Sequence, residues 1–350
     1  MTDKAPEKHI ETLSELLKLS GSQYRLYDIG RLVSKLPKEQ FEKVELNQLP
    51  YPTPTQGHAC IAIAFWQKQS SQPYLWLLKL PLDERGLLNQ GARNHFIAII
   101  IEALGEDLTQ ETTKKQEELL SSNPYLFTPS QYKLASLNSK IKVDLKQASS
   151  EYLPHFKEYL SQSFAWDNWH KVGVQGITDF VARIKQDNNE ELLTKALPHL
   201  PPEVLSPVCS ALENEQFSIT LINTLINEFN SALTSQENKA RAPLFLRALA
   251  ANSHHIYVKE AVSQLLIQPE VSTDILITLS SRCWLALAEQ QSLNHYFEHL
   301  LKNSEPELFP SIFKDLVTLP AVRAIAFQCI RSEHRSPELA QAVGQLFSQA

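Results

Sequence analysis

Residues 201–232 read PPEVLSPVCSALENEQFSITLINTLINEFNSA and set the pattern for the second half of the chain. They contain two apolar-periodic stretches, 202–213 and 218–232, which are separated by a short polar connection. Helices of about 10–16 residues joined by roughly 2–6 residues pack as antiparallel neighbours. This stretch therefore predicts a pair of antiparallel helices.

The same rhythm continues over the chain from about residue 150 onward, where strand-like alternation is absent. Apolar-periodic stretches follow one another at 152–162, 172–186, 189–199, 202–213, 218–232, 240–250, 255–267, 271–289, 291–302, 306–318, 319–331 and 336–348. Such a series of short helices is typical of stacked HEAT-like pairs, although no strict self-similarity and no ankyrin or tetratricopeptide signature occurs. We therefore expect a helical-repeat domain, an irregular α-solenoid, over residues 150–350.

Residues 1–145 differ, because strands and helices alternate there. His58–Trp66 (HACIAIAFW) and Tyr74–Leu80 (YLWLLKL) are apolar runs joined by the polar Gln67–Pro73, which predicts a β-hairpin covered on both faces. A helix from about Asn89 to Leu104 is apolar nearly all round its centre, Phe96–Ile101, so we expect it to pack on the hairpin. The remaining expected elements are a strand over Gln23–Ile29 and helices over 9–19, 37–45, 111–122 and 129–140. The chain is thus predicted to be mainly α, with a small α+β N-terminal domain.

Charge is divided unevenly between the two parts. Residues 151–350 hold 15 Lys and Arg against 22 Asp and Glu, a balance of −7, whereas residues 1–150 hold 18 against 17. Nucleic-acid-binding proteins normally carry a basic stripe that displaces counterions, so we expect no nucleic-acid partner. An acidic helical-repeat surface favours a basic protein partner.

The sequence also indicates the compartment. The N-terminal residues MTDKAPEKHIETL lack the apolar core of a signal peptide, and the longest apolar runs are too short to span a bilayer. No C-x-x-C pair occurs, so we expect buried free thiols in a reducing environment. These thiols are Cys60, Cys209, Cys283 and Cys329. We expect a cytoplasmic protein with no membrane association. Phosphate-loop, dinucleotide-binding, nucleophile-elbow and kinase motifs are absent, and we expect no cofactor.

His295-Tyr296-Phe297-Glu298-His299 matches the H-x-x-E-H pattern, in which two histidines bind zinc and the glutamate is the general base. The apolar stripe of this helix places His295, Glu298 and His299 on the opposite face, toward solvent. A catalytic zinc also needs a walled cleft and a third ligand. We therefore expect a solvated helix face and no metal, with metal binding at His295 and His299 as the alternative.

Asp83-Glu84-Arg85-Gly86 directly follows the second hairpin strand. Asp at the first position and Gly at the fourth are typical of a type I turn. Three consecutive charges also suit a recognition or acid/base site, and the first turns of the following helix are able to hold an anion. An enzyme or small-molecule-binding protein is therefore the alternative function. Its candidate residues are Asp83, Glu84, Arg85, Arg93 and His95.

Within LKLPLDERG, Leu82-Asp83-Glu84 resembles the short LDE motif of an uncharacterised bacterial family of similar length. The resemblance would cover nearly the whole chain. Since that family has no assigned activity, the resemblance implies a protein of unknown function and transfers no catalytic residue.

Residues 164–170, FAWDNWH, lie near the expected domain junction and contain Trp166 and Trp169. Tryptophans are enriched at binding hot spots. They equally suit filling the joint between an α+β domain and a solenoid, which is the interpretation we favour. With no catalytic motif present, the leading hypothesis is a non-enzymatic interaction scaffold that uses an acidic helical-repeat surface.

Overall fold

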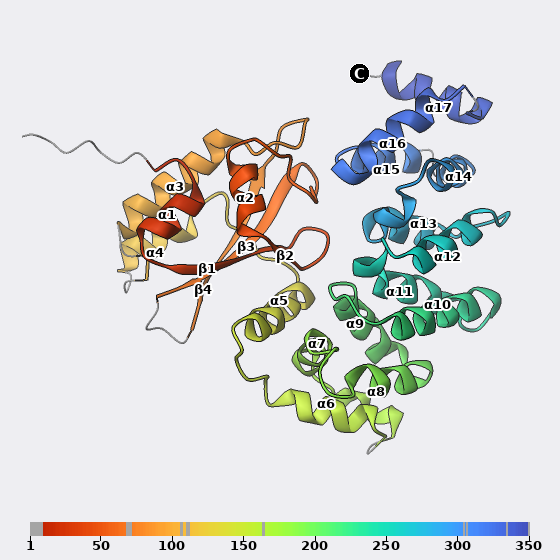
Figure 1. Cartoon of the computed structure of the whole chain (residues 1–350), viewed down its shortest axis with the longest axis horizontal. Coiled ribbons are helices and arrows are strands. Elements are labelled where there is room, and N and C mark those ends of the chain that lie inside the picture. Colours follow the sequence, from red (N-terminus) through yellow and green to blue (C-terminus); the bar gives the residue numbers. More distant parts are fainter. Residues whose placement is uncertain are drawn as a thin grey trace, which may run out of the picture. The chain divides into compact units, whose positions relative to one another are not determined.

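The computed structural model describes residues 10–67, 72–105, 108–109, 113–162, 165–303, 305, 307–333 and 335–348 (Figure 1). The chain divides into two compact units. The first unit is Met1–Gly30 with Ser34–Pro129, and the second is Arg31–Val33 with Ser130–Ala350. The expected mainly helical fold, with a small sheet near the N-terminus followed by a helical region, is confirmed.

The first unit contains a four-stranded antiparallel sheet in the order β2-β1-β3-β4. Its strands are β1 (Gln23–Asp28), β2 (Ser34–Leu36), β3 (His58–Trp66) and β4 (Tyr74–Pro81). The predicted hairpin is confirmed as β3 and β4, which pair with Ile63 opposite Trp76. β3 is buried from Ala59 to Phe65 because it is a central strand with both faces covered, as its continuous apolar run predicts. β2 was not predicted, since three residues are too few to show a period.

The helices of the first unit are α1 (Leu13–Leu19), α2 (Lys38–Glu45), α3 (Gln90–Leu104) and α4 (Lys114–Ser121). The predicted packing of α3 on the hairpin is confirmed: the rings of Phe96 and Trp76 meet edge to face at 5.6 Å, and Ile97 and Ile100 are buried. The apolar centre of this helix is not covered on every side, because Ile101 is 40% exposed. The covered side of α3 contacts β4, α1 and α4.

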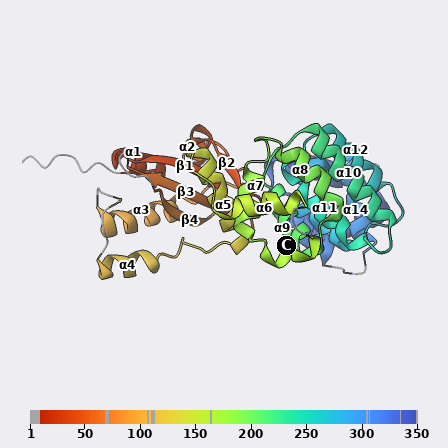
Figure 2. The same cartoon turned by 90° about the horizontal axis from the view of Figure 1, so that it is seen from below.

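The helices of the second unit form two layers, with each helix contacting the next but one along the chain (Figure 1). The first layer is α5 (Gln131–Asp144), α7 (Val174–Ala182), α9 (Pro202–Leu212), α11 (Ala242–Ala248), α13 (Thr273–Ser281) and α15 (Leu308–Leu316). The second layer is α6 (Tyr152–Leu160), α8 (Asn189–Ala196), α10 (Ile219–Thr234), α12 (Ile256–Leu266), α14 (Gln290–Leu301) and α16 (Pro320–Arg331). A last helix, α17 (Pro337–Ser348), packs on α14 and α16. This alternation is the arrangement of an α-solenoid, and Figure 2 shows the same stack from below.

Two features of the second unit differ from the sequence-based expectation. The stretch 271–289 is not one helix, because the backbone breaks at Arg282 (φ −127°, ψ −45°) before the short 3₁₀ helix η5 (Trp284–Leu287). The helix α5 groups with the second unit, whereas the sequence assigned residues up to 145 to the N-terminal domain.

A single apolar core runs through the second unit from Leu153 to Leu339. It includes Cys209, Cys283 and Cys329, and Cys60 is buried in the sheet of the first unit, so the predicted burial of the thiols is confirmed. Burial raises the pKa of the Cys209 thiol to about 12. Unreactive thiols of this kind fill space in the core.

Five charged side chains recur along the first layer, each in the last turn of a helix or at its C-cap. They are Asp179, Glu213, Arg247, Arg282 and Asp315, at intervals of 34, 34, 35 and 33 residues. The recurrence is hidden in the sequence because the sign of the charge changes. It indicates a structural repeat of about this length, with a charged side chain at the C-terminal end of each of these five helices.

Candidate functional site

The predicted site around Asp83 is a tight turn. The Asp83 carboxylate accepts hydrogen bonds from the backbone of Arg85 (2.9 Å) and Leu87 (2.8 Å), and it pairs with the Arg85 guanidinium (3.0 Å). Gly86 closes the turn with a φ of +81°, which glycine adopts at no steric cost. These backbone bonds lower the pKa of Asp83, with a smaller effect from Arg85. Asp83, Glu84 and Arg85 are exposed, so the enclosed carboxylates that an acid/base site requires are not present here.

Arg93 has a structural role in the first unit. Its side chain is 4% exposed and donates to the backbone carbonyl of Glu45, at the end of α2, and to Asn94 (2.9 Å). The Glu45 carboxylate in turn accepts from the backbone of Leu13 (2.6 Å) and from the Ser14 hydroxyl (2.6 Å), at the start of α1. Arg93 thus joins three helix ends and is not oriented to hold an external anion.

His95 lies on a different face of α3. It is exposed, and its Nδ1 lies 3.1 Å from the hydroxyl of Tyr125. The candidate group is therefore divided among three local contacts, since Asp83 bonds Arg85, Arg93 reaches α2 and His95 reaches Tyr125. A small-molecule site at these residues stays a prediction.

The two tryptophans differ in their surroundings. Both lie in the 3₁₀ helix η1 (Trp166–Lys171), between α6 and α7 of the second unit, and Phe164 lies outside the described residues. Trp166 is half-buried, stacks on His199 at 6.1 Å and meets Tyr159 edge to face at 5.3 Å. Trp169 is 40% exposed. Trp166 therefore fills a gap within the solenoid, and Trp169 is the one of the pair able to meet a partner.

The expectation that His299 faces solvent is wrong. His299 is 8% exposed, and its Nε2 lies 2.9 Å from the carbonyl of Leu266, the last residue of α12. The helical-wheel argument assumed one covered face, but α14 contacts α12, α16 and α17. His295 is half-buried, and within the described residues no group of three or more His, Cys, Asp or Glu side chains lies close enough to hold a metal ion.

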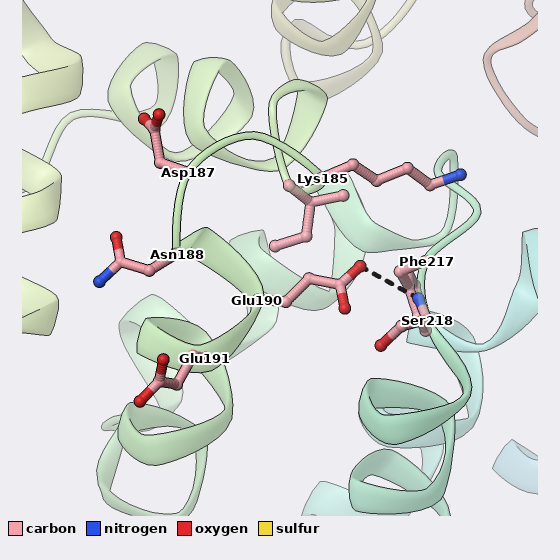
Figure 3. Close-up of a pocket in the computed structure, with 8 residues that line it drawn as sticks. Lys185, Asp187, Asn188, Glu190, Glu191, Phe217 and Ser218 are labelled. Atoms are coloured by element: carbon pink, nitrogen blue, oxygen red, sulfur yellow. Dashed lines mark hydrogen bonds between the residues drawn. The ribbon is translucent and has the colours of Figure 1, made fainter.

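An acidic cavity of about 570 Å³, which we call the acidic pocket, lies beside the loop between α7 and α8 (Figure 3). Its lining residues are Ile184, Lys185, Asp187, Asn188, Glu190, Glu191, Phe217 and Ser218. Glu190 points toward the start of α10, where its Oε1 accepts from the backbone of Ser218 (3.0 Å). In the same view, the Lys185 ammonium extends away from the carboxylates of Asp187 and Glu191.

The two outer carboxylates of the acidic pocket are accessible. The side chains of Asp187 and Glu191 are 71% and 64% exposed, and they pair with Lys157 (3.1 Å) and Lys195 (2.6 Å). Exposed pairs of this kind are weak and are screened by salt, so an incoming cation is able to displace them. The hydrogen bond from Lys195 lowers the pKa of Glu191. Sequence reasoning missed this cluster, whose signal was three carboxylates within five residues, 187–191.

Comparison with known proteins identifies the family. The family described as "Protein of unknown function (DUF3549)" matches residues 8–347, so the chain belongs to it. The expected resemblance to an uncharacterised family over nearly the whole chain is confirmed. No curated protein and no solved structure matches the chain significantly. Within the described residues, no helix is both long and apolar enough to cross a membrane.

Proposed function

We propose that this member of the DUF3549 family is a non-enzymatic interaction module, and that its solenoid binds a basic segment of a protein partner at the acidic pocket. The observation that carries the proposal is the pair of exposed carboxylates, Asp187 and Glu191, at the edge of a 570 Å³ cavity. Lys and Arg side chains carry the complementary charge.

The charge distribution around the acidic pocket supports a basic partner. No Lys or Arg occurs between Lys195 and Lys239, a stretch that contains α9, α10 and the carboxylates of Glu203, Glu228 and Glu237, besides Glu213 and Glu215, which are held in ion pairs. A surface with one sign of charge steers an oppositely charged partner and raises the association rate. Phe217, one of the lining residues, adds an apolar surface for the stem of a long cationic side chain.

We also propose that the module acts in the cytoplasm of a bacterium. The four buried free thiols support a reducing compartment. The resemblance described above supports the bacterial source.

The proposal is tested by titrating the full chain into a fluorescent Lys/Arg-rich peptide and measuring anisotropy. The double variant Asp187→Asn, Glu191→Gln removes both exposed charges. Asn is well suited to position 187, whose φ is +50°. The matched control is Asp274→Asn, Glu338→Gln, which removes two exposed carboxylates from the first turns of α13 and α17.

We expect the pocket variant to bind the peptide about threefold to tenfold more weakly at low ionic strength, and the control to bind as the parent does. The difference should shrink near physiological ionic strength, about 0.15 M. Equal losses in both double variants, or an affinity independent of salt, would refute a specific role for the acidic pocket. An acidic peptide of the same length tests for non-ionic binding.

A further inference from the structure

A second cavity, which we call the arginine pocket, lies in the first layer of the solenoid and has a different character. It has a volume of about 260 Å³ and is formed by the start of α5, the end of α9, α11 and the end of α13. Its lining residues are Ser130, Tyr132, Lys133, Ser136, Ser206, Ser210, Glu213, Asn214, Arg247 and Arg282. Three cations and one carboxylate line this cavity, although residues 151–350 carry a balance of −7.

The two arginines are fixed by one buried carboxylate. Glu213 is 2% exposed, and its Oε1 accepts from Arg247 Nη2 (2.9 Å), while its Oε2 accepts from Arg247 Nε and from Arg282 Nε (3.0 Å). Burial opposes the charge of Arg247, but the bond to Glu213 outweighs it and the pKa of Arg247 is raised. One carboxylate neutralises only one of the two guanidinium groups.

Each guanidinium retains a donor for a ligand. Arg247 Nη1 and Arg282 Nη2 have no acceptor within the described part of the chain, whereas Arg282 Nη1 donates to the Ser281 carbonyl (3.1 Å). The side chains of Arg247 and Arg282 are 31% and 25% exposed, so these groups are accessible from the cavity. A planar guanidinium held along one edge presents its other edge in a fixed orientation, the geometry that binds carboxylate and phosphate oxygens.

Two serines add hydroxyl groups to the lining of the arginine pocket. Ser136 and Ser210 are 8% and 7% exposed, and both line the cavity. Serine hydroxyls also commonly complete the coordination of an oxyanion.

We propose that the arginine pocket binds a small oxyanion, the phosphate or carboxylate group of a metabolite. Arg247 and Arg282 supply the charged donors, Ser136 and Ser210 supply neutral donors, and Lys133 adds a third positive charge at the lining. The cavity lies below the usual range of about 300–1,000 Å³ for drug-sized ligands, so it encloses one anionic group with a short remainder of the molecule. This site is separate from the acidic pocket, and its test does not depend on the proposed function.

The test is isothermal titration calorimetry of the full chain with inorganic phosphate and, separately, with succinate, at constant ionic strength. Arg282→Gln removes one free guanidinium edge, and we expect it to weaken binding at least about tenfold. The double variant Ser136→Ala, Ser210→Ala leaves the Glu213–arginine cluster intact, and we expect a loss of about threefold to tenfold. The controls are Arg331→Gln on α16 and Ser231→Ala on α10, both exposed positions outside the cavity, and they should bind as the parent does.

Binding of phosphate alone assigns a phosphoryl ligand, and binding of succinate alone assigns a carboxylate. Either result supports the proposal when the pocket variants lose affinity. The serine double variant keeps the test decisive if Arg282→Gln fails to fold. No heat from either anion, or equal affinity in the pocket variants and the controls, would overturn the proposal.

Discussion

Replacing Glu213 by alanine removes the carboxylate that Arg247 and Arg282 share in the second unit. Three hydrogen bonds are lost together, and two guanidinium groups remain without their common partner. We expect a large loss of stability, because Glu213 is 2% exposed and links the ends of α9, α11 and α13.

The magnitude follows from how far each partner is buried. Removing one member of a fully buried ion pair costs about 3–5 kcal/mol, because a buried charge is left unpaired. The two arginine side chains are 31% and 25% exposed, so water replaces part of what they lose. We therefore expect Glu213→Ala to reduce the free energy of unfolding by about 2–3 kcal/mol. At roughly 2–4 °C per kcal/mol for a unit of this size, the melting temperature should fall by about 4–12 °C.

The assay is urea and thermal unfolding followed by far-ultraviolet circular dichroism, with Glu191→Ala as the control. Glu191 is exposed and pairs with Lys195 within α8, so its replacement should leave the transition unchanged within error. Glu213→Gln, which keeps the shape but not the charge, should fall between the parent and Glu213→Ala. If Glu213→Ala unfolds at the same urea concentration as the control, the two arginines do not depend on Glu213 and the argument is wrong.

Two further predictions concern one glycine and one buried carboxyl group. A Cβ on Gly176 in α7 would lie 2.6 Å from the carbonyl oxygen of Tyr152 in α6, so Gly176→Ala should lower stability by about 1–3 kcal/mol despite the better helix propensity of alanine. Gly344→Ala in α17 is the control, because its Cβ would meet no atom within 4 Å, and it should raise stability by up to about 1 kcal/mol. Equal shifts in the urea midpoint of the two variants would contradict the predicted clash at Gly176. Burial raises the pKa of Glu45 above its unfolded value of about 4.3, against the opposing hydrogen bonds from Ser14 and Leu13. The stability of the parent relative to Glu45→Gln should therefore be highest below about pH 4 and fall as the pH rises through the folded pKa. Urea titrations measure this stability difference at each pH, and a difference that stays constant between acid and neutral pH would exclude the linkage.

The local sequence pattern was sufficient to predict those elements whose conformation and bounds depend on their own residues. The strand His58–Trp66 was predicted with its observed bounds because the apolar run ends abruptly at polar residues on the C-terminal side and forms a central strand. The turn at Asp83 was recognisable because Asp and Gly occupy the first and fourth positions of a single turn, which the backbone bond from Gly86 to Asp83 closes. Strand β2 was missed, because its three residues form a strand only through pairing with β1.

The predicted sites depended on contacts that a single helix does not reveal. His299 was assigned to a solvated face, yet it bonds the end of α12, a helix that ends 33 residues earlier. Arg93 was a candidate for holding an anion at the start of α3 under the alternative function, yet its guanidinium reaches the end of α2. In both cases the end of a neighbouring helix offered carbonyl groups that have no hydrogen-bond partner within their own helix. Burying a polar side chain is favourable only where it finds a hydrogen-bond partner of this kind.

The sequence by itself determined that the second half is a series of short helices, because a period of 3.6 residues and the prolines between the stretches are local properties. The tertiary structure alone decided that the helices stack in two layers and that first-layer helices which contact one another carry charged side chains at their C-terminal ends. These residues are Asp179, Glu213, Arg247, Arg282 and Asp315. The arginine pocket draws residues from 130 to 282, over four helices, and its recurring charged residues differ in sign, since Glu213 is followed by Arg247 and Arg282. No window of sequence contains that arrangement, because the buried carboxylate and the arginines it holds meet only after each helix has packed on the next but one.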